Sequence, residues 1–385
     1  MEKHFLLDPD IIFLNHGSFG ATPRPVFEAY QKWQRRLERQ PVHFIMHELW
    51  DHLAFAREKL GDFVGANPND LVFIPNSTFG LNVVARSLQL EPDSEVLTTN
   101  HEYGACDNVW HFLSQKQGFR YVQQPILLPV VTSEAIVEQL WQGVTSNTKY
   151  IFLSHITSAT ALCFPIAEIC RRARKEGIIT IIDGAHAPGQ VPLDLKTIDP
   201  DFYFGNTHKW VCSPKGSAFL YVRADKQHLI EPLVIGWGWG ENRALSFGSD
   251  FLDYTQWLGT NDLSAYLSVP AAIKFQRKHD WTAVRQQCHG LLSQAMHAIC
   301  TLTGLSPLYP ESNGFYHQMA TIPLPQLTDT DAFKLHLYKT YKIEVPLVTW
   351  NGRHYIRVSV QGYNSQSDIN TLIEALTECL PEFVA

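Results

Sequence analysis

Long hydrophobic runs are missing from this sequence. None of its apolar stretches approaches the roughly 18–20 residues that a membrane-spanning helix needs, so we expect no membrane segment. The first residues, MEKHFLLDPDIIF, carry acids and lack the basic-then-apolar order of a signal peptide. We therefore expect a protein of the cytoplasm.

An excess of positive charge is also missing. The chain has 31 Lys and Arg against 38 Asp and Glu, a net charge of -7 with 17 His counted as neutral. Nucleic acids and anionic membranes attract clustered positive charge, so neither is an expected partner. With 385 residues, 45% hydrophobic and 18% charged, the chain has the composition of an ordinary globular protein and the length for two domains.

Paired cysteines and nucleotide-binding motifs are absent as well. The seven cysteines are odd in number and contain no CxxC pair, which disfavours a disulfide framework and a zinc site. We expect no metal, and we expect the cysteines to be small buried hydrophobic residues. No G-x-x-x-x-G-K-[ST] motif occurs, and no G-x-G-x-x-G follows a strand, so nucleoside triphosphates and dinucleotides lack support as ligands.

Short apolar segments alternate with helix-like segments between about residues 55 and 225. This pattern predicts an α/β unit whose largely parallel sheet is covered on both faces and binds its ligand beyond the carboxyl ends of the strands. The expected strands are 71–74, 95–97, 150–153, 178–182, 202–204 and 218–222, and the expected helices are 78–88, 107–117, 133–141 and 166–176.

A smaller α+β unit with an antiparallel sheet is expected after the first. Its segments are a helical region at 271–303 with a break near Asp280, an apolar segment at 318–324, a helix at 329–341, two strands joined at Asn351 and Gly352, and a helix at 366–380 that a serine can cap. We expect residues 16–265 to form the large domain, and residues 1–15 with 266–385 to form the small one.

The most informative residues are Asp183 and Lys209. Asp183 ends an apolar run in IIDGAH, and Lys209 follows 26 positions later in the turn-rich segment DFYFGNTHKWVCSPKG at 201–216. Such a lysine can form a Schiff base with pyridoxal phosphate (PLP), and such an aspartate can keep the pyridine nitrogen protonated. Taken singly, the lysine could be a solvated charge and the aspartate a helix cap.

A possible phosphate site follows the first expected strand. The segment IPNSTFGLNVV at 74–84 enters its helix through Asn76, Ser77 and Thr78. Backbone N–H groups at a helix N-terminus, with hydroxyl groups beside them, bind phosphate. A plain N-cap is the alternative, since these residue types are preferred caps. A phosphate site without a nucleotide motif suits PLP.

Polar and aromatic residues follow further strands. HEYGAC at 101–106 supplies His101 and Tyr103. An aromatic ring at this place could cover a flat cofactor, or the Tyr could belong to the core. LSHITSAT at 153–160 supplies His155 and Thr157, whose hydroxyl could bond the cofactor or start a helix. His186 lies about one helical turn after Asp183 and could face the same pocket. Their common place at one sheet edge predicts a PLP site.

With these motifs in place, the chain resembles the class V aminotransferase family, and within it the isopenicillin N epimerases and their relatives. The shared segments are FLNHGSFGATP at 13–23, RLERQPVHF at 36–44, NSTFG, SHITS, DGAHAPG, HKW, GTND at 259–262 and YIRVSVQGYN at 355–364. The resemblance covers nearly the whole chain. It implies the PLP-dependent, aspartate-aminotransferase fold, with a mostly parallel seven-stranded sheet in the large domain.

The resemblance implies roles around the cofactor ring. Lys209 would be the catalytic lysine that carries PLP, and Asp183 would face the pyridine nitrogen. His186 and Thr157 would contact the phenolic oxygen, and Tyr103 would stack on the ring.

It also implies a phosphate site and a substrate site. Arg357 would bind the α-carboxylate of an amino-acid substrate, with Asn15 nearby; a guanidinium suits that planar group. The family forms its active sites at a homodimer interface, so Thr260 would reach the phosphate in the neighbouring subunit. The residues around the phosphate would be Ser77, Thr78, Asn206 and His208.

Several reactions at the substrate Cα stay open. We favour an epimerase of the isopenicillin N type, with a C–S lyase (for cysteine conjugates or hercynylcysteine sulfoxide) and an aminotransferase as alternatives. A non-catalytic binding protein of this fold is least favoured, since Lys209, Asp183 and Arg357 are all present.

Two departures from the family bear on the substrate and the reaction. The segment SATAL at 158–162 stands where the family often has Pro and Gly, which weakens the transfer of substrate preference. Cysteine desulfurases of the family use a nucleophilic cysteine before the arginine, and here none lies between Cys300 and Cys379. A persulfide-forming desulfurase is therefore not favoured.

Overall fold

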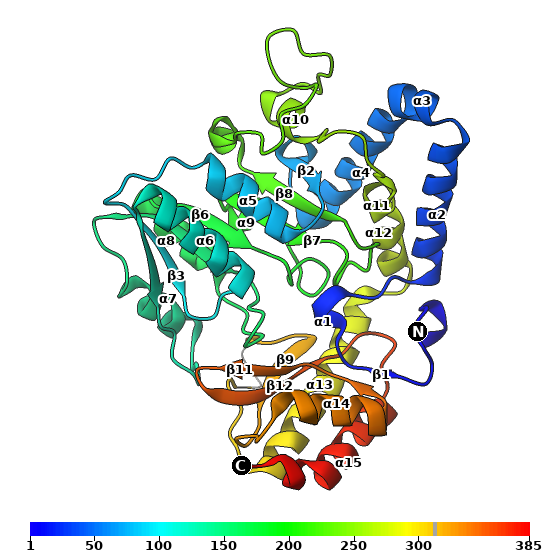
Figure 1. The fold of residues 1–385 in the computed structure, drawn as a ribbon, viewed down its shortest axis with the longest axis vertical. Coiled ribbons are helices and arrows are strands. Elements are labelled where there is room, and N and C mark those ends of the chain that lie inside the picture. Colours follow the sequence, from blue (N-terminus) through cyan, green and yellow to red (C-terminus); the bar gives the residue numbers. More distant parts are fainter. Residues whose placement is uncertain (311–313) are drawn as a thin grey trace.

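The computed structural model in Figure 1 describes residues 1–310 and 314–385. Its main feature is a seven-stranded sheet in the order β2-β8-β7-β6-β5-β3-β4. Strand β8 runs antiparallel to both of its neighbours, whereas the pairs from β7 to β4 are all parallel. The predicted α/β fold with a mostly parallel sheet is confirmed. The strands are β2 (Leu71–Ile74), β3 (Glu95–Thr99), β4 (Arg120–Gln124), β5 (Thr148–Ser154), β6 (Ile179–Asp183), β7 (Phe202–Asn206) and β8 (Ala218–Val222).

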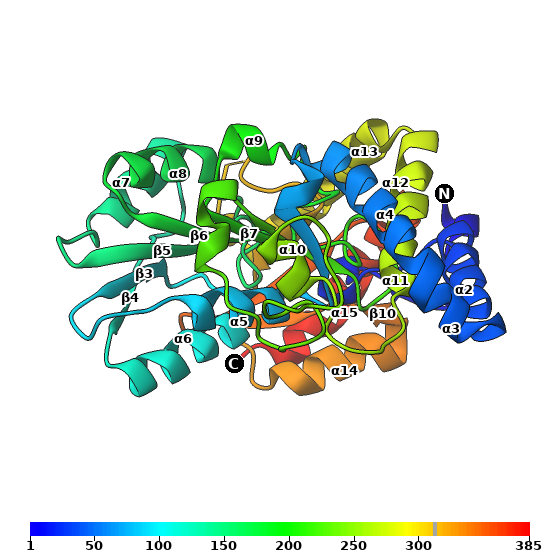
Figure 2. The same cartoon turned by 90° about the horizontal axis from the view of Figure 1, so that it is seen from above.

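Helices cover both faces of this sheet, as Figure 2 shows. Successive side chains of a strand point to opposite faces, so each strand feeds two cores. On β2, Val72 and Ile74 join the core formed with α5 (Ser77–Ser87) and α6 (Gly104–Gln117). The alternate residues Leu71 and Phe73 join a second core, to which α4 (Leu49–Val64), α7 (Ser133–Trp141) and α8 (Ile166–Lys175) contribute. Burial on both sides explains why these strands are apolar runs.

Other helical segments precede or connect these elements. Helix α1 (His16–Phe19) leads to α2 (Arg24–Arg39), and α2 leads through α3 (Pro41–His43) and the π-helical turn η2 (Phe44–Glu48) to α4. The remaining short segments are η1 (Glu2–His4), η3 (Pro68–Asp70), α9 (Leu195–Ile198), η4 (Ala224–Leu229), α10 (Asp250–Thr255) and α11 (Ser264–Leu267).

A three-stranded antiparallel sheet in the order β11-β12-β9 forms the lower part of the molecule in Figure 1. Strand β1 (Ile12–Phe13) pairs in parallel with β10 (Ile343–Glu344), which brings the N-terminal segment to the same region. The expected division of the chain at residue 265 stays a prediction. The elements are β9 (Met319–Pro323), α14 (Thr330–Tyr341), β11 (Leu347–Trp350), β12 (Arg353–Ser359) and α15 (Gln366–Phe383).

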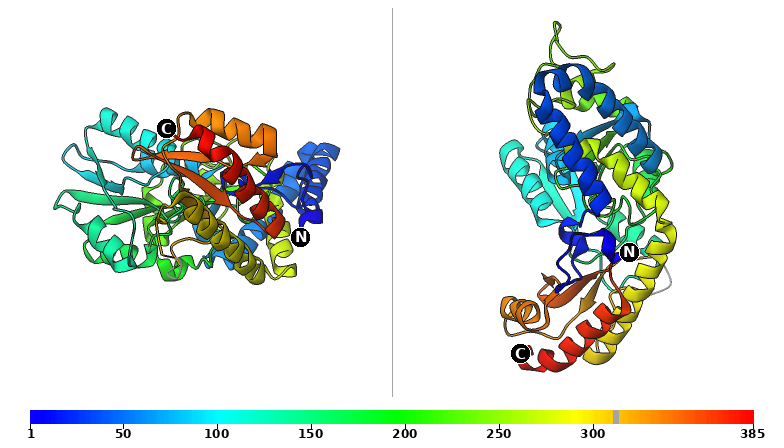
Figure 3. Two further views of the ribbon diagram at one scale, coloured as in Figure 1. Left: turned by 90° about the horizontal axis from the view of Figure 1, so that it is seen from below. Right: turned by 90° about the vertical axis from the view of Figure 1, so that its right-hand side faces the viewer.

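Two consecutive helices join the two sheets, as the right-hand view of Figure 3 shows. Helix α12 (Val269–Lys278) packs on α2 and α4, and α13 (Trp281–Thr303) packs on β9 and α15. Between them, Asp280 adopts a left-handed conformation with φ of 43°, so the predicted break is confirmed. One hydrophobic core contains side chains from α4, α12, α13 and α15 and is continuous across the sheets.

Among the described residues, every helix is either too short or too polar to cross a lipid bilayer. The cytoplasmic location stays a prediction.

Candidate active site

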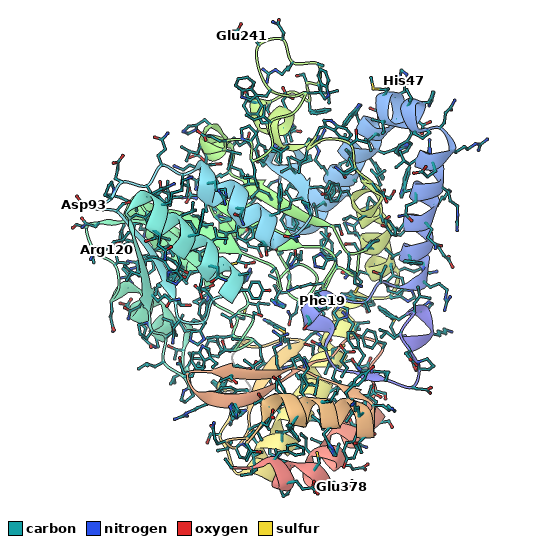
Figure 4. All side chains as sticks on the ribbon, viewed as in Figure 1. Phe19, His47, Asp93, Arg120, Glu241 and Glu378 are labelled. Atoms are coloured by element: carbon teal, nitrogen blue, oxygen red, sulfur yellow. The ribbon has the colours of Figure 1, made fainter. Side chains whose placement is uncertain are left out.

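A cavity of about 400 Å³ opens beyond the carboxyl ends of β2, β3, β5, β6 and β7. It lies between the two sheets, where Figure 4 labels Phe19. The strand ends converge there because β2 runs parallel to β7, and β7 to β6, β5 and β3. The predicted residues that line the cavity are Ser77, Thr78, Tyr103, Asp183, His186, Asn206, His208, Lys209 and Arg357.

Three predicted residues do not line it. Thr157 is fully buried, and its hydroxyl bonds to Thr160 Oγ1 at 2.8 Å and accepts from the backbone N–H of Leu162 at 2.9 Å. Thr260 is exposed on the segment after α10. Asn15 contacts the cavity only through a residue that lines it, since its Oδ1 accepts a hydrogen bond from the hydroxyl of Ser18 at 2.5 Å.

Asp183 is a buried carboxyl group at the end of β6. One of its oxygens accepts from the backbone N–H of Ala185 at 2.8 Å, and the thiol of Cys106 donates to the other at 3.5 Å. Burial raises the pKa of Asp183, while that N–H and the charge of Lys209 act in the opposite direction. A protonated ring nitrogen beside this carboxylate would supply the compensating charge.

A second carboxyl group, Glu102, lies behind Asp183. Its Oε1 accepts from Thr99 Oγ1 at 2.7 Å, and its Oε2 accepts from the backbone N–H and the hydroxyl of Ser154 at 2.8 and 2.6 Å. Burial raises the pKa of Glu102 to about 8, and the charge of Asp183 adds to this shift. Glu102 thus links the end of β3 to cavity residue Ser154 on β5.

The amine of Lys209 is enclosed and faces His186. Lys209 Nζ lies 3.2 Å from His186 Nε2, and the indole N–H of Trp210 donates to His186 Nδ1 at 3.4 Å. Burial, assisted by the charge of Arg357, lowers the pKa of Lys209 to about 8. At pH 7 roughly a tenth of the amine is therefore uncharged, and this nucleophilic fraction rises as the pH approaches 8.

The start of α5 has the form of a phosphate site. Asn76 caps the helix by accepting from the backbone N–H of Phe79 at 2.9 Å, and Asn206 Oδ1 accepts from the N–H of Ser77 at 2.9 Å. The hydroxyl of Ser77 is buried and has no hydrogen-bond partner among the described residues. An unpartnered buried hydroxyl at a helix N-terminus fits a phosphate group.

His208 lies beside this phosphate site. Its Nδ1 bonds to the carbonyl oxygen of Ser217 at 3.0 Å. Burial lowers the pKa of His208 to about 4, so the ring is neutral, and its Nε2 carries no proton because Nδ1 donates to Ser217. A phosphate dianion would favour protonation at Nε2 and would turn this nitrogen into a donor.

Arg357 on β12 is a buried cation without an anionic partner among the described residues. Its Nη1 donates to the backbone oxygen and the hydroxyl of Ser158 at 2.7 and 3.1 Å, and its Nη2 donates to Ser18 Oγ at 3.1 Å. Its Nε, also buried, has no partner within the described part of the chain. Burial lowers the pKa of Arg357 only to about 10, so it stays charged and can bind a carboxylate.

The sequence did not point to several residues that shape the cavity. Ser18 and Ser158 hold Arg357, Cys106 contacts Asp183, and Glu102 and Trp210 act from behind the lining. Glu102 lies inside the HEY motif, and Trp210 directly follows Lys209. Their positions within or next to a motif were the signal by which the sequence could have indicated them. The contacts themselves join residues far apart in the chain.

Solved structures share this architecture. A cystine C–S lyase in complex with its product cysteine persulfide has a TM-score of 0.84 at 20% identity, covering 98% of this chain and 99% of that chain. The apo cysteine desulfurase from Thermococcus onnurineus NA1 has a TM-score of 0.85 at 20% identity, covering 99% of this chain and 98% of that one. The fold is that of the PLP-dependent enzymes.

Sequence comparisons narrow this class. The isopenicillin N epimerase of Amycolatopsis lactamdurans is 34% identical, over 97% of this chain and 96% of that protein. The hercynylcysteine sulfoxide lyase of Schizosaccharomyces pombe is 26% identical, over 98% of this chain and 96% of that protein. A family model described as aminotransferase class-V matches residues 12–372. The chain belongs to the class V aminotransferase family; it is a PLP-dependent enzyme, and PLP is its cofactor.

Proposed function

We propose that this chain is an amino-acid epimerase of the isopenicillin N type, which removes the proton from the Cα of an α-amino acid and returns it on the other face. The supporting observation is the enclosed amine of Lys209, in one cavity with Arg357, a buried cation that has no anionic partner among the described residues. Isopenicillin N epimerases from two organisms are 34% and 32% identical to this chain along nearly its whole length.

Several residues of the cavity have a part in this proposal. PLP supplies an electron sink that stabilises negative charge at Cα. Lys209 would take or return the Cα proton, and Arg357 would hold the α-carboxylate so that the Cα–H bond has a fixed direction. Asp183 would face the ring nitrogen, and Tyr103 would lie against the ring.

The phosphate and the phenolic oxygen need further partners. We assign the phosphate to the hydroxyl groups of Ser77 and Thr78 at the start of α5 and to His208. Asn206 would act indirectly, because its Oδ1 holds the N–H of Ser77. His186, beside Lys209, would contact the phenolic oxygen. Thr157 could reach it only after its present hydrogen bonds were broken.

A C–S lyase is the second candidate. One observation favours it over a desulfurase: no cysteine is found among the described residues that line the cavity. A β-elimination needs no thiol on the enzyme, whereas persulfide formation does. The relatives include a hercynylcysteine sulfoxide lyase and L-cysteine desulfhydrases, whose names indicate cleavage of a C–S bond. An aminotransferase, which requires a second substrate, is the third candidate.

We also propose a homodimer. Thr260 is exposed and does not line the cavity of its own chain, so its expected contact with a cofactor phosphate requires a second subunit. Large apolar side chains are exposed nearby on residues 231–249, namely Leu233, Val234, Ile235, Trp237 and Trp239. A second copy of the chain would cover them.

Product analysis in deuterated water tests the reaction. The PLP-loaded enzyme is incubated with a panel of L-amino acids, including peptides with a free α-amino acid end and cysteine conjugates. An epimerase returns the substrate with inverted, deuterated Cα. Lys209→Ala serves as the control, because it lacks the amine proposed to move the proton.

The other outcomes assign the alternatives. Pyruvate with release of a sulfur compound would replace the epimerase by the lyase. An oxo acid with the aminated cofactor would replace it by the aminotransferase. If wild-type protein and Lys209→Ala exchange the Cα proton equally fast, Lys209 has no catalytic role.

A further inference from the structure

Trp210, the residue after Lys209, contacts the other side of the imidazole that faces the lysine amine. Trp210 is fully buried, and its Nε1–H points at His186 Nδ1 at 3.4 Å. The second ring nitrogen of His186, Nε2, lies 3.2 Å from Lys209 Nζ. One imidazole therefore stands between an indole, which can only donate, and an amine.

This arrangement selects one tautomer of His186. Burial, with the charge of Lys209 as the next cause, holds the pKa of His186 well below its usual value, so the ring is neutral. A neutral imidazole carries one N–H, and a nitrogen that accepts from an indole cannot carry it. The proton must lie on Nε2 and point at Lys209. An amine can accept this hydrogen bond through its lone pair, but an ammonium group cannot.

We propose that Trp210 is a positioning residue that fixes the Nε2–H tautomer of His186 and thereby favours the free-amine form of Lys209, which attacks the cofactor aldehyde. In that attack the amine nitrogen bonds to the aldehyde carbon, and the aldehyde oxygen leaves as water. The inference rests on the proposed role of Lys209 and deepens it: the indole supplies no atom to the reaction and acts only through His186.

Other groups also influence the two nitrogens, but none of them depends on the indole N–H. Arg357 on β12 opposes protonation of Lys209, and Asp183 and Cys106 favour it. Besides burial, the groups that oppose protonation of His186 are Lys209, Arg357 and His208. Because tryptophan and phenylalanine are both uncharged, Trp210→Phe removes the indole N–H together with part of the ring volume, and it leaves all these groups in place.

The test is the rate at which cofactor-free, full-length protein takes up PLP as a function of pH. In the wild type, the rate should rise with a midpoint near 8, where Lys209 loses its proton. In Trp210→Phe, the proton of His186 is free to move to Nδ1, and Nε2 then accepts from the ammonium form of Lys209. The midpoint should shift upward, and a shift of about one unit lowers the uptake rate at neutral pH roughly tenfold.

Trp110 on α6 provides a matched control. It is also fully buried, and its indole nitrogen has no hydrogen-bond partner among the described residues. Trp110→Phe removes the same atoms from a core position outside the cavity, so thermal stability should fall while the uptake midpoint stays at the wild-type value. An unchanged midpoint in a folded Trp210→Phe protein would overturn the inference.

His186→Gln gives a second route if Trp210→Phe does not fold. An amide can turn its oxygen toward the ammonium group, so the midpoint should again rise, and a wild-type midpoint would count against the inference. Borohydride reduction followed by peptide mapping separates the two proposals. If wild-type protein carries PLP on another lysine, the proposed role of Lys209 fails; if PLP is on Lys209 but the variants titrate alike, only the role of Trp210 fails.

Discussion

Glu102, the buried carboxyl group behind Asp183, should give the free energy of unfolding a pH dependence that can be traced to one side chain. Its pKa is raised from 4.5 to about 8, so between these values the folded protein holds a proton that the unfolded chain releases. The free energy of unfolding should therefore fall as pH rises through this range. One such group contributes a slope of about 1.4 kcal/mol per pH unit at most.

Glu102→Gln should remove that slope from the cofactor-free protein, because the amide does not ionise. The amide can still accept from the N–H of Ser154 and donate to Thr99 Oγ1. Urea unfolding at several pH values between 5 and 8 measures the effect. Thr99→Val keeps the carboxyl group and should keep the slope. Parallel curves for the wild type and Glu102→Gln would show that this carboxyl group does not bind the proton.

The proposed carboxylate-binding role of Arg357 has a cost in stability, since a buried charge without an anion is unfavourable. Arg357→Met should weaken amino-acid binding by about 2–5 kcal/mol without lowering the free energy of unfolding of the substrate-free protein. Amino-acid titrations, followed by the visible absorbance of bound PLP, measure the first quantity, and urea unfolding measures the second. Arg57 on α4 is another buried arginine, and its guanidinium donates to the backbone oxygen of Pro68, outside the cavity. Arg57→Met should therefore leave amino-acid affinity unchanged. Equal affinities for Arg357→Met and the wild type would remove Arg357 from the substrate site.

At the scale of single elements, a substitution at the start of helix α5 tests the proposed phosphate site. The hydroxyl of Ser77 has no partner in the described structure, so its loss should not destabilise the cofactor-free protein. A hydrogen bond to a charged group contributes about 1.5–3 kcal/mol, and Ser77→Ala should therefore weaken PLP binding roughly 10- to 100-fold. Equilibrium dialysis measures the dissociation constant.

Ser87, at the other end of α5, is the matched control. Its hydroxyl donates to the backbone oxygen of Val83 at 2.7 Å and accepts from the N–H of Glu231 at 2.9 Å. Ser87→Ala should lower thermal stability and leave PLP affinity unchanged. The reverse pattern, with normal PLP affinity in Ser77→Ala, would place the phosphate elsewhere.

The strands of the large sheet were predictable where both faces are buried. β2, β6, β7 and β8 are apolar throughout or nearly so, β5 is apolar in its central part, and the sequence indicated all of them within a few residues. Strand β4 was missed because it is the sheet edge: its residues, RYVQQ, are exposed or half-buried and largely polar. The two-residue strands β1 and β10 are too short to leave a pattern.

The candidate site was predictable as far as motifs mark strand ends. Asp183, Lys209 and the NST segment follow apolar runs, and parallel strands bring such ends together. The partners of Arg357 and His186 could not be found in this way. Ser18 lies 339 positions from Arg357, and Trp210 lies 24 positions from His186, so only the folded chain shows which polar atoms meet.

At the scale of the whole molecule, the exposed tryptophans should lie in a dimer interface. Trp237 and Trp239 are 69% and 54% exposed on the loop that projects above α10 in Figure 1, near Glu241 in Figure 4. Sedimentation velocity should show a dimer for the wild type. The double variant Trp237→Ser, Trp239→Ser should shift the protein toward monomer and weaken PLP binding, because the cofactor phosphate would then lose its contact with Thr260 of the neighbouring copy.

Phe112→Ser is the control for exposed apolar area. Phe112 lies on α6 and is 51% exposed, away from the projecting loop. Its replacement should leave the sedimentation coefficient unchanged. A wild-type protein that stays monomeric at all concentrations would contradict the homodimer proposal.

One hydrophobic core continues from α4 through α12 and α13 to α15. This continuity also determines how the chain unfolds. A protein whose two sheets had separate cores could melt in two steps and leave one sheet intact. Here the side chains that close the large sheet and those that close the small one are neighbours in a single cluster, so loss of either exposes the other to water. The chain should therefore unfold cooperatively. Lys209, which follows β7 of the large sheet, and Arg357, on β12 of the small sheet, should lose their native positions at the same temperature.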